Sequence, residues 1–91
     1  MIERDEATNS IRNALAMLGE RMSRNPGYGV YIHANEQLGR MLAELGHPYL
    51  APIPKRDWVD VGFMAAKELE DVDPEFADAL MKADYEFKRA K

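Results

Sequence analysis

Few side chains in this 91-residue sequence can carry out chemistry, and their spacing assembles no familiar catalytic site. Aliphatic hydroxyl groups occur only at Thr8, Ser10 and Ser23, far in sequence from the two histidines, His33 and His47. A serine hydrolase places its nucleophile on a sharp turn between a strand and a helix, and none of these hydroxyls has that context. We therefore predict that the chain has no catalytic residue and is not an enzyme.

Metal and phosphate chemistry is equally weak in the sequence. His33 and Glu36 stand three apart, a helical spacing that lets two side chains share a metal, but two ligands make only half a site. Residues 27–29, Gly-Tyr-Gly, resemble part of a phosphate-binding loop, yet no strand precedes them. Acid pairs such as Glu68 and Asp71 fit a solvated helix face better than carboxylate catalysis. The chain has no cysteine for a thiolate site, so we expect no metal and no cofactor.

Charge is unevenly distributed along the chain, which has a net charge of −4. Residues 1–56 hold seven basic and six acidic side chains, whereas residues 57–91 hold five basic and ten acidic ones. Nucleic acids are met by basic faces, so we expect no nucleic-acid partner, and the acidic half suits a basic protein partner. The charged N-terminal residues are unlike a signal peptide, and no run approaches the roughly 20 apolar residues of a membrane span. We expect a cytoplasmic protein that does not contact membranes.

Helical periodicity in four stretches predicts an all-α fold, a small single-domain bundle of about four helices over residues 1–91. The first helix is expected over residues 3–24, with one apolar stripe facing inward. Pro26 cannot continue it; we expect Asn25 to cap the second helix and Pro26 to lie in its first turn. That helix should end near Leu45, with Gly46 in a left-handed conformation.

Three prolines within residues 47–54 exclude a continuous helix there, and this loop is expected to be held to the bundle by Tyr49, Leu50 and Ile53. Asp57 is then expected to cap a third helix over residues 58–69. Residues 73–75, Asp-Pro-Glu, are the clearest local signal, because they combine a capping side chain, a proline for the first position and an acid near the helix dipole. The fourth helix should point four residues inward: Phe76, Leu80, Ala83 and Phe87.

Four aromatic side chains exceed what the core of a small bundle needs: Tyr28, Tyr31, Tyr49 and Trp58. Tyr and Trp are frequent anchors of protein interfaces. Alternatively, each ring packs inward and leaves its polar tip in water. The sequence leaves both interpretations open for each of the four.

Two longer stretches carry a family resemblance. The first is Asn25-Pro26-Gly27-Tyr28, followed by Val30 and Glu36-Gln37-Leu38; the second begins Gly62-Phe63-Met64-Ala65-Ala66-Lys67-Glu68-Leu69 and continues through Asp71, Asp73-Pro74-Glu75, Ala79-Leu80 and Tyr85. Together they resemble the type VI secretion immunity proteins that protect against NAD(P)+ glycohydrolase effectors. The resemblance covers residues 5–85, and the sequence departs from the family's pattern at Gly29 and in the loop 47–54.

The resemblance implies a helical protein without enzymatic activity that binds a secreted toxin domain and occludes its dinucleotide cleft. An acidic, aromatic surface would suit a cleft that is basic for phosphates. We therefore expect seven partner-binding residues: Tyr28, Tyr31, Trp58, Glu68, Asp71, Asp73 and Glu75. A helical adaptor or an antitoxin for a different protein partner is the alternative, and a homodimer is a further possibility.

Overall fold

The structure, a computed structural model, describes residues 2–91. In that range it contains four α-helices and one short 3₁₀ helix: α1 (Arg4–Arg24), α2 (Gly29–Leu45), η1 (Ile53–Arg56), α3 (Val61–Glu68) and α4 (Pro74–Arg89). The β-structure of the described residues is one isolated bridge between Ile2 and Ala90. The predicted all-α fold with four helices is confirmed.

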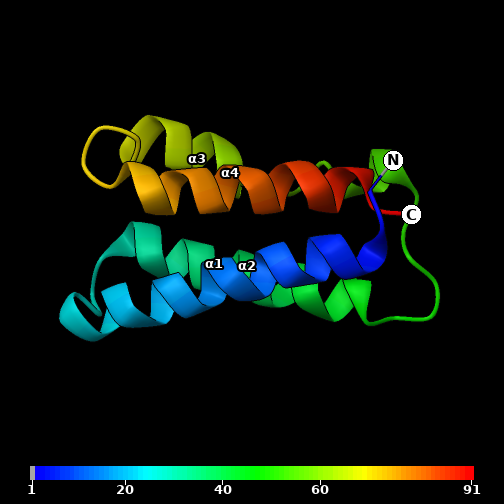
Figure 1. Cartoon of the computed structure of the whole chain (residues 1–91), viewed down its shortest axis with the longest axis horizontal. Coiled ribbons are helices and arrows are strands. Elements are labelled where there is room, and N and C mark those ends of the chain that lie inside the picture. The colour runs from blue at the N-terminus through cyan, green and yellow to red at the C-terminus, as the bar shows by residue number, and fades with distance from the viewer. Residues whose placement is uncertain (1) are drawn as a thin grey trace.

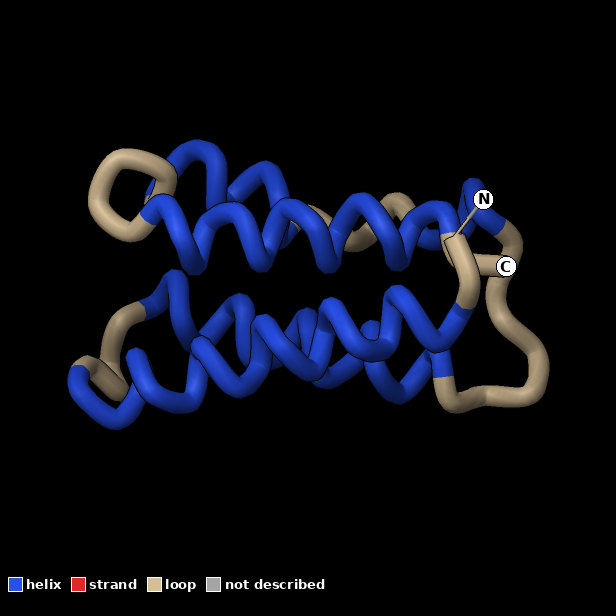
Figure 2. Tube along the Cα trace, in the orientation of Figure 1, coloured by secondary structure: helices blue, strands red, loops and turns tan. Residues whose placement is uncertain are grey.

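The four α-helices form two layers, with α1 beside α2 in one and α3 beside α4 in the other (Figure 1). α4 is central, because it packs against α1, α3 and η1. The turn 25–28 and the turn between α3 and α4 lie at one end of the bundle, whereas both chain termini and the loop after α2 lie at the other (Figure 2). The long axis of the molecule measures 36 Å.

Apolar side chains at helical spacing build the core, as the periodicity predicts. In α1 the fully buried positions recur every three or four residues, at Ala7, Ile11, Ala14 and Leu18. All four residues expected to point inward from the fourth helix are buried: Phe76, Leu80, Ala83 and Phe87. The start of α4 is also confirmed, since Asp73 is the N-cap and accepts a hydrogen bond from the backbone N–H of Phe76.

The predicted end of the second helix at Leu45 is confirmed, but its predicted start and the left-handed conformation expected of Gly46 are wrong. Asn25 does not cap α2; its backbone N–H still donates to Arg21 O and ends α1. Pro26 and Gly27 then form a turn closed by a bond from Tyr28 N–H to Asn25 O, and α2 begins only at Gly29. At the other end Gly46 is right-handed, with φ −79°, because the chain leaves through a tighter turn in which His47 N–H donates to Glu44 O.

The predicted cap of the third helix is also wrong. Residues 53–56 form η1, Asp57 follows as its C-terminal residue, and α3 begins at Val61 rather than Trp58. In the preceding loop, Tyr49 is 85% exposed and Ile53 is also exposed, so neither holds the loop to the bundle. Leu50 alone of the three expected residues packs against the core.

Distant side chains cap α3 instead. The Gln37 side-chain oxygen, from α2, accepts hydrogen bonds from the backbone N–H groups of Asp60 and Val61 at 2.9 and 2.8 Å. Asp84, from α4, accepts one from Gly62 N–H at 2.8 Å. A Cβ atom at Gly62 would lie 2.9 Å from the Asp84 side chain, so glycine is what permits this close approach. Three free N–H groups of the helix start thereby find partners.

A buried arginine donates hydrogen bonds to backbone carbonyl groups at the end of α4. Arg56 is buried, and its guanidinium donates to the carbonyl oxygens of Phe87 and Ala90 at 2.9 and 2.6 Å and to Ala51 O at 2.9 Å. Burial lowers the pKa of Arg56 from its ordinary value, because it removes water from the charged form. η1 and the loop before it are thus fixed to the last turn of α4.

Gln37 offers a direct test of the capping of α3. Replacing it with Leu keeps the approximate size of the side chain but leaves the N–H groups of Asp60 and Val61 without an acceptor. We therefore expect a loss of about 2–4 kcal/mol in the free energy of unfolding. Urea denaturation followed by circular dichroism measures it. Asn35→Leu, an amide removed from the exposed side of the same helix, should change stability by less than about 0.5 kcal/mol. Equal urea midpoints for the two variants would contradict the capping role.

Candidate partner-binding surface

The structure brings six of the seven expected partner-binding residues to one end of the bundle. Tyr28 and Tyr31, at the start of α2, pack edge to face with ring centroids 4.8 Å apart. Tyr31 also meets the buried ring of Phe76, at the start of α4, at 6.0 Å. Both tyrosines are half-buried, because each ring packs inward while part of it faces solvent.

Asp73 is fixed at this end by a two-pronged ion pair. Arg21 Nε and Nη2, at the end of α1, donate to the two carboxylate oxygens of Asp73 at 2.6 and 3.2 Å. The Arg21 guanidinium also lies over the Phe76 ring, 5.0 Å from its centre. The hydrogen bond from Arg21 holds the pKa of Asp73 below its ordinary value of 3.8, and the same bond raises the pKa of Arg21. The charge of Asp73 is therefore engaged within the chain.

The other three acids are exposed. Glu68 ends α3, Asp71 lies in the turn that follows, and Glu75 lies in the first turn of α4. Val72, which lies between Asp71 and Asp73 in the sequence, is 76% exposed. It was not among the predicted residues, although its two acidic neighbours in the sequence indicate a solvent-exposed position. We call this surface, made of Tyr28, Tyr31, Glu68, Asp71, Val72, Asp73 and Glu75, the acidic end. It combines exposed carboxylates with one exposed apolar side chain.

Trp58 lies apart from the acidic end. Its ring packs on Phe87 at 5.9 Å, and the Arg40 guanidinium covers it at 3.7 Å from the ring centre. It borders a hollow of about 270 Å³ lined also by His33, Glu36, Gln37 and Arg40. His33 and Glu36, the pair considered for metal binding, both line this hollow. His33 Nε2 lies 2.7 Å from Asp60 Oδ1, and this hydrogen bond lowers the pKa of Asp60.

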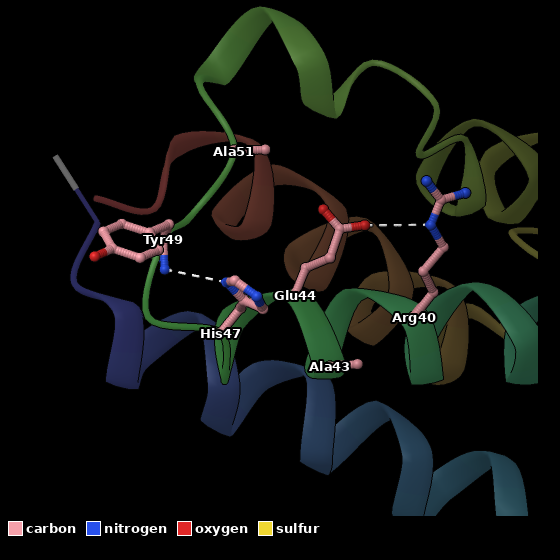
Figure 3. A pocket seen from close by; sticks show the side chains of 6 residues that line it. All are labelled: Arg40, Ala43, Glu44, His47, Tyr49 and Ala51. Carbon is pink, nitrogen blue, oxygen red and sulfur yellow. Dashed lines mark hydrogen bonds and ion pairs between the residues drawn. The ribbon is translucent and has the colours of Figure 1, made fainter.

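A larger hollow of about 450 Å³ opens next to Arg40, between the end of α2 and the loop after it (Figure 3). Arg40 pairs with Glu44 across one helical turn at 3.2 Å. His47 Nδ1 accepts a hydrogen bond from the backbone N–H of Tyr49, which fixes the proton of a neutral His47 ring on Nε2. Ala43 and Ala51 complete the lining. The aliphatic hydroxyls of Thr8, Ser10 and Ser23 are not among its lining residues.

Residues 2–91 contain neither a cluster of metal ligands nor a helix suited to cross a membrane. Within that range His, Asp and Glu side chains nowhere gather in groups of three as metal ligands. None of the helices there is both long enough and apolar enough to cross a membrane.

By its fold the chain falls in the class of small all-helical bundles, and comparison with known proteins defines it further. The sequence model of the Tsi6 family matches residues 6–89. The solved structure of Tsi6 from Pseudomonas aeruginosa superposes with a TM-score of 0.81 at 32% sequence identity, over 96% of this chain and 85% of that one. The chain therefore belongs to the Tsi6 family, a family of type VI secretion immunity proteins. No curated protein sequence matches it significantly.

The Arg21–Asp73 ion pair makes the stability of the chain depend on pH. Because the pKa of Asp73 is depressed in the folded state, its contribution is complete above the unfolded pKa and is lost as pH falls through the folded one. Asn still caps a helix, so Asp73→Asn isolates the charge. We expect wild type to exceed this variant by about 1–2 kcal/mol at pH 7, with the difference shrinking toward pH 3.

Urea denaturation of both proteins at several pH values measures this difference. Glu36→Gln removes an exposed carboxylate from α2 and should leave the midpoint nearly unchanged throughout. A stability difference between wild type and Asp73→Asn that stays constant with pH would refute the role of the ion pair.

Proposed function

We propose that this protein is an immunity protein that acts by binding the toxin domain of a cognate type VI effector and covering its active site. Membership of the Tsi6 family, established over residues 6–89, is the observation that carries the proposal. Since the toxin would act on the contents of the cell that makes the immunity protein, we place this binding in the cytoplasm. In this proposal the chain performs no reaction of its own and inhibits by obstruction.

We further propose that the toxin hydrolyses NAD(P)+, so that the covered site is a dinucleotide cleft. This step rests on the resemblance of residues 25–38 and 62–85 to immunity proteins against glycohydrolase effectors. A cleft that binds a pyrophosphate presents positive charge, which complements an acidic partner surface. The acidic end supports this assignment, because it presents exposed carboxylates together with an exposed apolar side chain.

The residues of the acidic end have different roles in this proposal. Glu68, Asp71 and Glu75 are exposed and meet the basic rim of the cleft, while Val72 supplies apolar contact. Asp73 acts indirectly, because its ion pair with Arg21 fixes the start of α4. Tyr28 and Tyr31 contribute the exposed parts of their rings. Trp58 lies on a separate patch, so it belongs to this interface only if the toxin also extends along α2.

A candidate toxin domain, taken from a type VI effector gene sought beside this chain's own gene, provides the first test. We expect purified protein to stop its consumption of NAD+ at a one-to-one ratio, to raise the apparent Kd for NAD+, and to rescue cells that express the toxin. Binding by calorimetry without any NAD+ consumption by the free toxin would reject the glycohydrolase assignment alone. Absence of both binding and rescue would reject the immunity function for this pair.

Charge reversal tests the acidic end. We expect Asp71→Lys combined with Glu75→Lys to lower the association rate for the toxin by about tenfold or more at low salt, and by less at high salt. The matched control is Asp5→Lys with Glu6→Lys, which reverses two exposed acids in the first turn of α1, at the opposite end of the bundle. Similar rates for the two double variants, measured by surface plasmon resonance, would place the interface elsewhere.

A further inference from the structure

A stripe of exposed side chains along α4 is used by neither the core nor the acidic end. Asp78, Lys82, Tyr85 and Arg89 follow one another at steps of four, three and four, which places them on one face of the helix. All four are exposed, and Tyr85 is 54% exposed with the Arg89 guanidinium stacked 3.8 Å from its ring centre. This face of α4 therefore presents three charged side chains and one aromatic ring to solvent.

A hollow adjoins the stripe on the side of α3. It measures about 390 Å³ and is bordered by Phe63, Met81, Tyr85 and Lys88 among others. Phe63, from α3, is 73% exposed, a large apolar side chain with no packing role in the core. Exposed aromatic side chains gathered beside a hollow are typical of a surface that another protein covers.

We propose that this face is the interface between two copies of the chain, which pair their α4 helices in antiparallel orientation. The spacing of the stripe is symmetric about a point between residues 83 and 84. A two-fold axis through that point places Asp78 opposite the partner's Arg89, and Lys82 opposite the partner's Tyr85. Such an interface uses the same patch on both copies, as two-fold symmetry requires.

The charges favour this pairing over its alternatives. Asp78 and Arg89 are eleven residues apart, about 16 Å along the helix, so they cannot pair within one chain. A parallel arrangement would set like charges opposite each other, which is unfavourable. The basic cleft proposed for the toxin is also a poor match, because Lys82 and Arg89 outnumber Asp78 in the stripe and leave it positively charged. A second copy supplies both the carboxylate and the cation that this face needs.

The apolar part of the face fits the same geometry. Phe63 borders the hollow from α3, and Tyr85 borders it from α4. The two-fold axis passes close to this level of α4, so aromatic rings from both copies meet there and each copy covers the exposed Phe63 of the other.

Sedimentation equilibrium of the full chain, from micromolar to millimolar concentration, tests the proposal. We expect a monomer–dimer equilibrium, weakened at least about tenfold by Asp78→Arg or by Arg89→Asp alone, because each sets like charges opposite one another. The two substitutions combined in one chain should restore the dimer, since the exchanged charges face each other again across the axis. Arg12→Asp, an exposed change on α1, is the control and should leave the equilibrium unchanged.

Circular dichroism confirms folding for each variant, and Phe63→Ser replaces any charge variant that fails to fold. Because Phe63 is exposed, its loss should weaken the dimer without lowering the urea midpoint. A wild-type chain that is monomeric at every concentration would overturn the proposal, as would single variants that weaken the dimer without rescue by the combination. Weaker toxin binding by Phe63→Ser with an unchanged mass would assign the face to the toxin instead.

Discussion

The placement of α3 depends on hydrogen bonds that its own sequence does not supply. A helix of eight residues is too short to be stable alone in water, where about 12 residues are needed even for favourable sequences. Gln37 from α2 and Asp84 from α4 accept bonds from its first N–H groups, and Gly62 allows α4 to come near enough. Because α3 ends at Glu68 and leads directly into the turn that carries Asp71, these contacts also determine where the acidic end lies.

The buried polar side chains serve the architecture throughout the described residues. Gln37 accepts hydrogen bonds from backbone N–H groups at the start of α3, and Arg56 donates to backbone carbonyls at the end of α4. Asp84 accepts a hydrogen bond from Gly62 N–H in α3 and forms an ion pair with Lys88 at 2.8 Å. In residues 2–91 no buried side-chain nitrogen or oxygen atom is left without a hydrogen-bond partner. Polar groups of this kind specify how helices pack, since each costs free energy if its partner is displaced. These buried polar side chains therefore contribute to the fold, whereas a partner protein would contact the exposed ones.

Local signals predicted the elements whose ends are made locally. α1 and α4 follow from apolar periodicity, and Asp73 with Pro74 marks the start of α4 because a side chain three residues away makes the cap. The starts of α2 and α3 could not be found in this way. Asn25 is engaged in ending α1, and the caps of α3 come from residues more than twenty positions away. Likewise, sequence placed Trp58 with the acidic residues, whereas packing on Phe87 and Arg40 holds it elsewhere.

The two ends of the described chain are held together by backbone hydrogen bonding and an ion pair. Ile2 bridges Ala90, Lys91 N–H donates to Ile2 O at 3.1 Å, and the Lys91 ammonium lies 3.1 Å from Glu3. Segments joined before Ile2 or after Lys91 therefore leave the bundle from one corner, a helix length away from Asp73 and Tyr31. A fluorophore or an affinity handle attached there would report on capture of a toxin without standing in its way. The same adjacency makes the chain a natural candidate for circular permutation, with new ends opened in the exposed loop before η1.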